Sequence, residues 1–181
     1  MEVLQVPNMK GGNGDTSYAN NSLIQRKIVS IRKSVRDETM LDLLSTSSIH
    51  KSLSIANLGC SSGPNTFMVV SDLMDIVHSK YSSLGYQTTE YLVYLNDLLG
   101  NDFKSVFTSL QGFHGNLKES IGDKFGQCFI FEVPRSFYGR LFPSKSLHFV
   151  HSSCSVHWLS LVQIVVLRLS LNMKVFNVSY L

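Results

Sequence analysis

Apolar positions along the chain follow two different spacings, one typical of helices and one typical of strands. Between residues 23 and 44 they recur at steps of three and four, which predicts a helix with one buried stripe. That stripe contains Leu23, Ile24, Ile28, Ile31 and Val35. A second helix is predicted to begin near Thr66, with Phe67, Val69 and Leu73 on its apolar face.

Four short apolar runs lie between the helical segments and predict strands. They are residues 53–58 (LSIANL), 91–95 (YLVYL), 128–133 (CFIFEV) and 147–150 (LHFV). The first run leads through a glycine-containing turn into a helix, which is the opening unit of a doubly wound α/β sheet. The pattern therefore predicts an α/β fold built on a parallel sheet.

Composition supports one folded domain. The chain has 181 residues, of which 44% are hydrophobic and 16% are charged, so it has enough apolar material for a core. The formal net charge of +3 comes without a basic cluster of the kind that binds nucleic acid. The densest basic group has helical spacing and is predicted to form a solvated helix face; its members are Arg26, Lys27, Arg32, Lys33 and Arg36.

The expected lack of a secretory signal and the cysteine usage favour a cytoplasmic protein. The first residues lack a cationic start followed by an apolar run, so we expect no secretory signal. The three cysteines, Cys60, Cys128 and Cys154, are odd in number and share no short spacing, which fits a reducing compartment. Polar residues interrupt the Leu- and Val-rich segment 161–181, so it is interpreted as strand material and no membrane contact is expected.

The turn at residues 59–65 (GCSSGPN) lies where such folds hold a nucleotide-like ligand. It lacks the third glycine of a dinucleotide-binding turn and the lysine of a phosphate-binding loop. Asp97, at the end of the second strand, could accept hydrogen bonds from both ribose hydroxyls, while Leu98 and Phe137 could flank a base. An adenine nucleoside without phosphate fits this set, most economically S-adenosylmethionine. A tight turn beside an ordinary strand-end Asp remains the alternative.

Four motifs in order resemble the SABATH family of plant methyltransferases, which includes the salicylate, benzoate and jasmonate carboxyl methyltransferases. The motifs are residues 9–25, 55–66 (IANLGCSSGPNT), 95–103 (LNDLLGNDF) and 136–160. The resemblance implies a class I, Rossmann-like methyltransferase fold that depends on S-adenosyl-L-methionine, with an N-terminal helical cap element and a truncated C-terminus. Residues 1–160 would form a partial methyltransferase domain, and 161–181 a divergent tail.

The resemblance also implies two sets of site residues. The cofactor would be held by Tyr18, Ser22, Asn57, Gly59, Cys60, Asn65, Asp97, Leu98, Ser136, Phe137 and Ser153. The substrate would be held by Gln25, Cys154, His157 and Trp158. Gln25 and Trp158 would position the acceptor carboxylate. Residues 7–17, which by composition alone suggest a frayed terminus, match a segment that closes over the ligands.

The implied reaction is methyl transfer to the carboxyl group of a small aromatic or related acid, forming a methyl ester. A carboxylate is ionised at neutral pH and needs no general base, so catalysis would consist of positioning. The resemblance implies that the family's magnesium ligands lie in the missing C-terminal half, so no metal ligand is expected in this chain. Where the family usually has Asp and Tyr, this sequence has Asn57 and Cys154.

Other interpretations of the same residues stay open. The chain could be an inactive truncated fragment that associates with a full-length homologue, or a homodimer. A nicotinamide-dependent oxidoreductase would lack its glycine motif. The three-residue spacing of His148, His151, Cys154 and His157 suggests zinc, but such residues lie on different faces of a strand. Cys154 could be a nucleophile, and Trp158 could be a core residue.

Overall fold

The computed structural model describes residues 14–15, 17–46, 51–122, 125–155 and 175–176. Its described strands form one parallel sheet in the order β3-β2-β1-β4-β5. The strands are β1 (Ser52–Leu58), β2 (Glu90–Asp97), β3 (Cys128–Pro134), β4 (Phe149–Ser152) and β5 (Val175–Phe176). The chain thus runs outward from β1 to β3 and then returns to the other side of β1, which confirms the predicted doubly wound α/β architecture.

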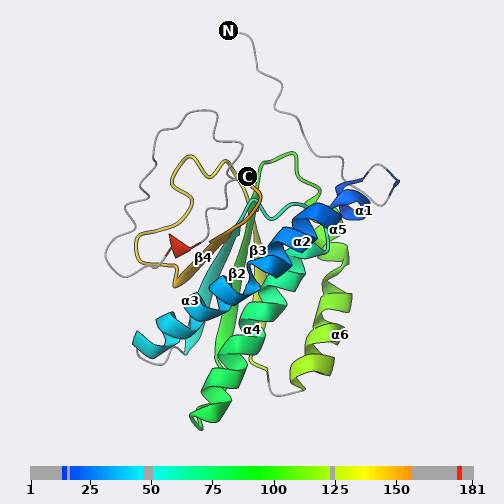
Figure 1. Cartoon of the computed structure of the whole chain (residues 1–181). Coiled ribbons are helices and arrows are strands. Elements are labelled where there is room, and N and C mark those ends of the chain that lie inside the picture. The colour runs from blue at the N-terminus through cyan, green and yellow to red at the C-terminus, as the bar shows by residue number, and fades with distance from the viewer. Residues whose placement is uncertain (1–13, 16, 47–50, 123–124, 156–174, 177–181) are drawn as a thin grey trace.

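The helices of the described part cover one face of this sheet. They are α1 (Tyr18–Asn21), α2 (Leu23–Ile31), α3 (Lys33–Thr46), α4 (Asn65–Ser83), α5 (Phe103–Thr108) and α6 (Leu110–Ile121). Figure 1 shows α2, α3, α4 and α6 on the same side of the strands. Right-handed crossovers explain the side taken by α4, α5 and α6, because α4 connects β1 to β2, and α5 and α6 connect β2 to β3, in the same direction across the sheet.

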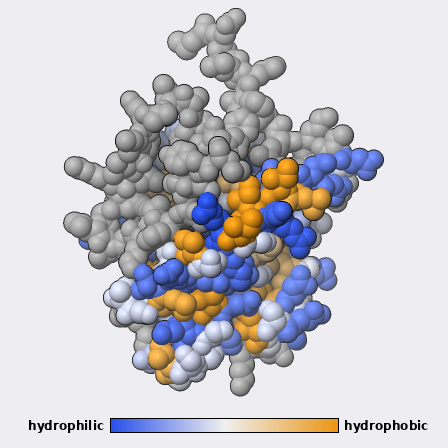
Figure 2. All heavy atoms as spheres, in the orientation of Figure 1, coloured by the Kyte–Doolittle hydropathy of each residue, from blue (hydrophilic) through white to orange (hydrophobic). Residues whose placement is uncertain are grey.

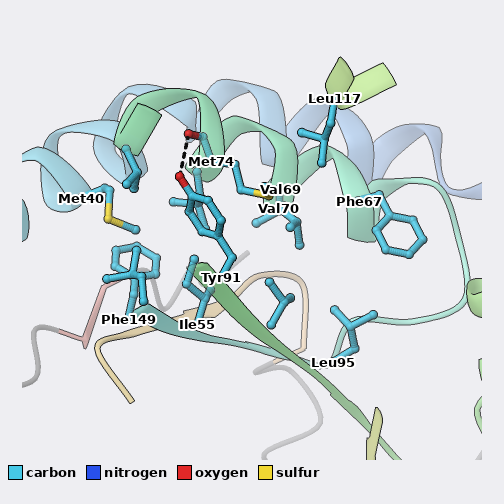
Figure 3. Packing of buried hydrophobic residues seen from close by; sticks show 14 of the residues in the cluster. Met40, Ile55, Phe67, Val69, Val70, Met74, Tyr91, Leu95, Leu117 and Phe149 are labelled. Atoms are coloured by element: carbon cyan, nitrogen blue, oxygen red, sulfur yellow. Dashed lines mark hydrogen bonds between the residues drawn. The ribbon is translucent and has the colours of Figure 1, made fainter. Parts of the chain in front are cut away.

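The main core lies between the sheet and α4. Ile55, Tyr91 and Phe149 point from three neighbouring strands toward the helices (Figure 3). The Tyr91 hydroxyl donates a hydrogen bond to the Met74 carbonyl oxygen at 3.5 Å, and burial raises the pKa of this phenol. The apolar face predicted for α4 is confirmed, since its residues at three- and four-residue steps are buried here: Phe67, Val69, Val70, Leu73, Met74 and Val77.

The N-terminal helical segment differs from its prediction in two respects. It forms two helices that join at Arg32, rather than one continuous helix. The predicted buried stripe is largely exposed: the exposed fractions are 72% for Leu23, 71% for Ile24 and 66% for Ile31. Hydrophobic residues gather at the surface over α2 in Figure 2. The buried side is instead set by where α4 lies: the buried residues are Val29 of α2 and Arg36, Thr39, Met40, Leu43 and Leu44 of α3.

One member of the predicted solvated basic face is buried. Arg36 is only 2% exposed, and its guanidinium forms an ion pair and hydrogen bond with Asp72 of α4. Burial lowers the pKa of Arg36, and the negative charge of Asp72 opposes that shift. Lys33 Nζ lies 2.9 Å from the other oxygen of Asp72. Arg36 and Lys33 therefore link α3 to α4, and the spacing of the charges alone could not distinguish this from a solvated face.

The predicted strand positions agree with β1, β2 and β3 to within two residues. The fourth strand begins two residues later than predicted, because its pairing with β1 starts at Phe149 opposite Ile55. Of the segment 161–181, the structure describes only the two residues of β5, which pair with β4; the rest lies outside the described residues. Among the helices of the described part, none has the length and apolar character that a membrane span requires.

Candidate functional site

The turn after β1 packs against the loop after β4. Gly59 has φ +69°, a conformation that side chains rarely adopt, and a Cβ there would lie 1.9 Å from Ser155 Oγ. The Ser155 hydroxyl can donate to the carbonyl oxygen of Ser153 at 3.1 Å or of Gly59 at 3.3 Å. Glycine at 59 is therefore required both by backbone conformation and by the close approach of these two loops.

The carboxylate of Asp97 lies at the end of β2 and is fixed by backbone amides. One of its oxygens accepts from the Ser61 amide at 2.7 Å, and the other accepts from the Leu98 amide at 2.8 Å. Ser61 has φ +61°, and its carbonyl oxygen accepts from Asn101 Nδ2 at 3.2 Å. Each carboxylate oxygen keeps a further lone pair, so Asp97 can still accept hydrogen bonds from a diol.

Asn96, near the end of β2, ties this strand to the end of β3 and to the residue that follows it. Its Nδ2 donates to the carbonyl oxygens of Val133 at 2.7 Å and Arg135 at 2.6 Å. This places the predicted cofactor residues Ser136 and Phe137 just beyond β3, next to the end of β2 that carries Asp97. Leu98, Ser136 and Phe137 are partly exposed and do not line the cavity described next.

A cavity of about 30 Å³ lies between α2, the start of α4, the turn after β1 and the end of β4. It brings together residues that the sequence assigned to two different ligands. The predicted cofactor residues in its lining are Asn57, Gly59, Cys60, Asn65 and Ser153. The predicted substrate residues in its lining are Gln25 and Cys154. Ser22 is tied to this place because its carbonyl oxygen accepts from Asn65 Nδ2 at 3.2 Å.

Gln25 supplies an unsatisfied polar atom to this cavity. Its Oε1 is buried and has no hydrogen-bond partner among the described residues. A buried oxygen without a partner costs free energy, roughly 1–3 kcal/mol. The unpaired oxygen therefore favours a ligand that donates a hydrogen bond to Gln25 Oε1.

Asn57 and His151 form a buried polar pair at the wall of the cavity. They are register neighbours on β1 and β4, each is 4% exposed, and His151 Nδ1 lies 3.0 Å from Asn57 Oδ1. Burial, and to a lesser extent the positive charge of Arg36, lowers the pKa of His151 to about 3. His151 is therefore neutral at physiological pH.

The cysteine thiols at the site do not have the properties of activated nucleophiles. Cys60 is buried, and its thiol donates to the Ser61 carbonyl oxygen at 3.4 Å. Burial, followed by the negative charge of Asp97, raises the pKa of Cys60 far above its usual value. Cys154 Sγ lies 3.6 Å from Ser153 Oγ, a neutral hydroxyl rather than an activating base. The neighbourhood of Cys60 therefore does not stabilise a thiolate.

Several predicted site residues lie where little or nothing can be described. His157 and Trp158 lie outside the described residues, and of Tyr18 only the backbone, in α1, is described.

The histidines of the zinc alternative do not share a partner. His151 pairs with Asn57, whereas His148 Nδ1 accepts from the Ser54 amide at 2.9 Å. Within the described ranges, no three His, Cys, Asp or Glu side chains come together as metal ligands.

Three residues of the site were missed by sequence reasoning. His151 appeared there only as a zinc alternative, and neither Ser61 nor Ser155 was singled out. The role of His151 depends on its register opposite Asn57, and that of Ser155 on the approach of two loops 96 residues apart. The hydrogen bond from the Ser61 amide to Asp97 depends on a left-handed backbone conformation at Ser61, which serine seldom adopts. None of these features leaves a signal in local sequence.

Comparison with known proteins identifies the family to which this fold and site belong. Residues 4–177 match the model of the SAM dependent carboxyl methyltransferase family. The chain belongs to this family, which confirms the resemblance to SABATH methyltransferases.

Individual relatives agree with this assignment. The chain is 54% identical over 162 residues to "Probable jasmonic acid carboxyl methyltransferase 1" of Theobroma cacao, and the match covers 90% of this chain and 43% of the relative. It is 52% identical over 162 residues to a Petunia hybrida benzoic acid/salicylic acid carboxyl methyltransferase, covering 90% and 45% of the two chains. The chain thus spans less than half the length of these curated relatives.

A solved structure supports the class I methyltransferase fold. The structure of loganic acid methyltransferase with SAH superposes with a TM-score of 0.70 at 38% identity. The match covers 86% of this chain and 42% of that one. The predicted fold class is confirmed.

Proposed function

We propose that this chain forms the cofactor-binding half of a methyltransferase that uses S-adenosyl-L-methionine to methylate the carboxyl group of a small aromatic or related acid. The acceptor would be similar to salicylate or benzoate, and the product would be a methyl ester. The observation that carries the proposal is the cavity where predicted cofactor residues and Gln25 meet, beside a rigidly held Asp97.

The described residues fit this cofactor. Asp97 has lone pairs left for ribose hydroxyls, and Leu98 and Phe137 offer apolar surface for adenine near it. Gly59 leaves the backbone of the β1 turn open to close approach. Asn57, Asn65 and Ser153 provide neutral polar groups for an amino-acid tail, to which we also assign Ser22 and Tyr18. Ser136 is assigned to the adenosine end.

The chemistry that we propose requires orientation rather than proton transfer. When bound, S-adenosyl-L-methionine supplies a methyl group on a positively charged sulfur. The NH2 group of Gln25 and the indole N–H of Trp158 would donate to the acceptor carboxylate so that one oxygen faces that methyl group, and alignment of this kind is worth about 7–11 kcal/mol. Cys154 and His157 would shape the acceptor pocket. A neutral His151 and an un-ionised Cys60 suit a reaction without a protein base or nucleophile.

Binding of S-adenosylhomocysteine, the product form of the cofactor, tests the proposal. We expect saturable one-site binding in calorimetric titration, and a loss of about 10- to 100-fold in affinity for Asp97→Ala, because hydrogen bonds to a charged group are lost. Asp102→Ala is the matched control: it removes a nearby carboxylate that caps α5 through the Ser105 amide. Equal affinity of Asp97→Ala and wild type would contradict the proposal.

Methyl transfer to a panel of aromatic acids then tests the acceptor. We expect benzoate-type acids to be methylated in preference to purines, and Gln25→Ala to reduce the rate. Equal binding of acids and purines would overturn the substrate assignment.

Two further points complete the proposal. Magnesium, which the family resemblance implies, is assigned no role in the described residues. We propose a cytoplasmic location.

A second candidate is a non-catalytic role in which the chain associates with a full-length homologue, or with a second copy of itself. One observation favours it: the exposed apolar residues of α2. Co-expression with an intact homologue tests it. Absence of co-purification together with an unchanged rate of the homologue would exclude it.

A further inference from the structure

The side chain of Asn96 takes over where the hydrogen-bonded ladder between β2 and β3 stops. Among the described strands, β3 has only β2 as a neighbour, and their pairing ends with Pro134 opposite Asp97. Pro134 has no N–H, and the N–H of Arg135 turns back to the Val133 carbonyl oxygen at 2.9 Å. Neither residue can therefore donate a backbone hydrogen bond to β2, and a side chain holds the end of β3 instead.

Asn96 supplies this attachment through both hydrogens of its amide. Its Nδ2 lies 2.7 Å from the Val133 carbonyl oxygen and 2.6 Å from that of Arg135. The orientation of the amide is fixed, because turning it over would bring Oδ1, which has no hydrogen-bond partner in the described structure, against two carbonyl oxygens. Asn96 is 0% exposed, so both hydrogen bonds are shielded from water.

The hydrogen bond to Arg135 directs the turn that follows β3. The carbonyl of Arg135 belongs to the peptide group that leads into Ser136, so this bond sets the direction in which the turn begins. Within the turn, the Tyr138 amide donates to Ser136 Oγ at 3.4 Å, which shapes the turn but does not attach it to the sheet. Phe137 lies in this turn, and its position relative to β2 therefore depends on Asn96.

The backbone of Asn96 is bonded to the turn after β1. Its carbonyl oxygen accepts from the Cys60 amide at 2.9 Å, and the next amide, that of Ser61, donates to the Asp97 carboxylate. These contacts do not involve the Asn96 side chain. Asn96 thus connects the acid assigned to the ribose with the ring assigned to the base, while the acid itself is held independently of the Asn96 amide.

We propose that Asn96 is a positioning residue whose side-chain amide holds Phe137 relative to Asp97 so that one adenosine can contact both. The inference rests on the proposed function and deepens it, since that function assigns Asp97 to the ribose and Phe137 to the adenine. The Asn96 side chain then governs the affinity for the base and leaves the affinity for the ribose and the amino-acid tail unchanged.

Calorimetry of the full chain with two ligands tests this division. S-adenosylhomocysteine carries the base, whereas S-ribosylhomocysteine has the same ribose and amino-acid tail without it. Asn96→Ala removes both donors, and we expect it to lower the affinity for S-adenosylhomocysteine about 10-fold and that for S-ribosylhomocysteine less than about 2-fold. A purely structural role of Asn96 would lower both affinities alike.

Two further variants make the result specific. Asp72→Asn breaks the ion pair between α3 and α4 and controls for lost stability, so it should retain the wild-type ratio of the two affinities. In the Phe137→Ala background the ring is already absent, so Asn96→Ala should cost no further affinity for S-adenosylhomocysteine. A further loss in that background would contradict the proposal.

Circular dichroism first establishes that each variant is folded. If Asn96→Ala is unfolded, Asn96→Ser, whose hydroxyl can still donate one hydrogen bond, takes its place. Failure of both variants to fold would overturn the inference, because Asn96 would then be required for the whole fold rather than for one turn.

The outcomes separate this inference from the proposed function. A wild type that binds S-adenosylhomocysteine, with an Asn96 variant whose affinities for the two ligands are unchanged or equally reduced, overturns the inference alone. A folded wild type that does not bind S-adenosylhomocysteine overturns both.

Discussion

Gly59 combines two constraints that other glycines of this chain meet separately. Gly85 has a similar φ of +73° but lies in open space, whereas Gly126 has no such φ but a Cβ there would lie 1.7 Å from the Thr89 carbonyl oxygen. Gly59 has both a φ of +69° and no room beside Ser155. The three positions therefore separate the conformational cost of a side chain from its steric cost.

Alanine at these positions gives the first stability prediction. Gly85→Ala should lower the free energy of unfolding by about 1–2 kcal/mol, the cost of a left-handed conformation. Gly59→Ala should cost about 1–3 kcal/mol more, because the Ser155 loop must also move. Urea denaturation of both variants measures the difference, and equal losses would show that the loops after β1 and β4 are not in close contact.

His151 gives a prediction for pH. Its pKa is about 3 in the folded chain against an ordinary 6.5, so below pH 6.5 the unfolded chain binds a proton that the folded chain does not. Stability is therefore highest above pH 6.5 and falls as the pH falls, with about 2 kcal/mol lost at pH 5. Denaturation of His151→Gln should show a shallower slope between pH 5 and 6.5, whereas the exposed His114→Gln should not. An unchanged slope in His151→Gln would contradict the prediction.

Among the helices, the contact between α3 and α4 depends on a charge pair as well as on apolar packing. Asp72→Asn leaves the buried Arg36 without its carboxylate and should lower the free energy of unfolding by about 3 kcal/mol. Asp75→Asn is the control on the same helix; burial and the charge of Asp72 raise the pKa of Asp75, so removing its charge should cost little. Thermal or urea denaturation compares the two, and equal effects would show that the α3–α4 pair contributes nothing specific.

The elements themselves could largely be predicted from the sequence, but their neighbours could not. Periodic apolar residues located α4, because one face of this helix is buried against the sheet. Short apolar runs located the first three strands, of which β1 and β2 are largely buried. The same reasoning was wrong for Leu23, Ile24 and Arg36, since spacing cannot say which side of a helix meets α4. In the site, Gly59 and Asp97 follow from strand-end chemistry, whereas His151 and Ser155 depend on strand register and loop contact.

For the whole molecule, the exposed residues of α2 predict association. Leu23 and Ile24 are consecutive residues of α2 and are both largely exposed. Hydrophobic residues gather at the surface over α2 (Figure 2), and such patches mark contact sites. Replacing them together, as Leu23→Glu and Ile24→Lys, should reduce self-association, or co-purification with a homologue, measured by size exclusion with light scattering. Leu84→Glu, at the residue that ends α4 and is 50% exposed, is the control. Association that persists in the double variant would exclude this surface.

The strand order also has a consequence for synthesis on the ribosome. Asn57 emerges early in the nascent chain, but its hydrogen-bond partner His151 follows 94 residues later. Strands β1, β2 and β3 with helices α4 to α6 can pair while the other edge of β1 is still bare. The wall that β4 gives to the cavity is added only after these elements have been translated. A chain translated only as far as residue 148 would therefore lack β4 and, with it, one wall of the ligand cavity.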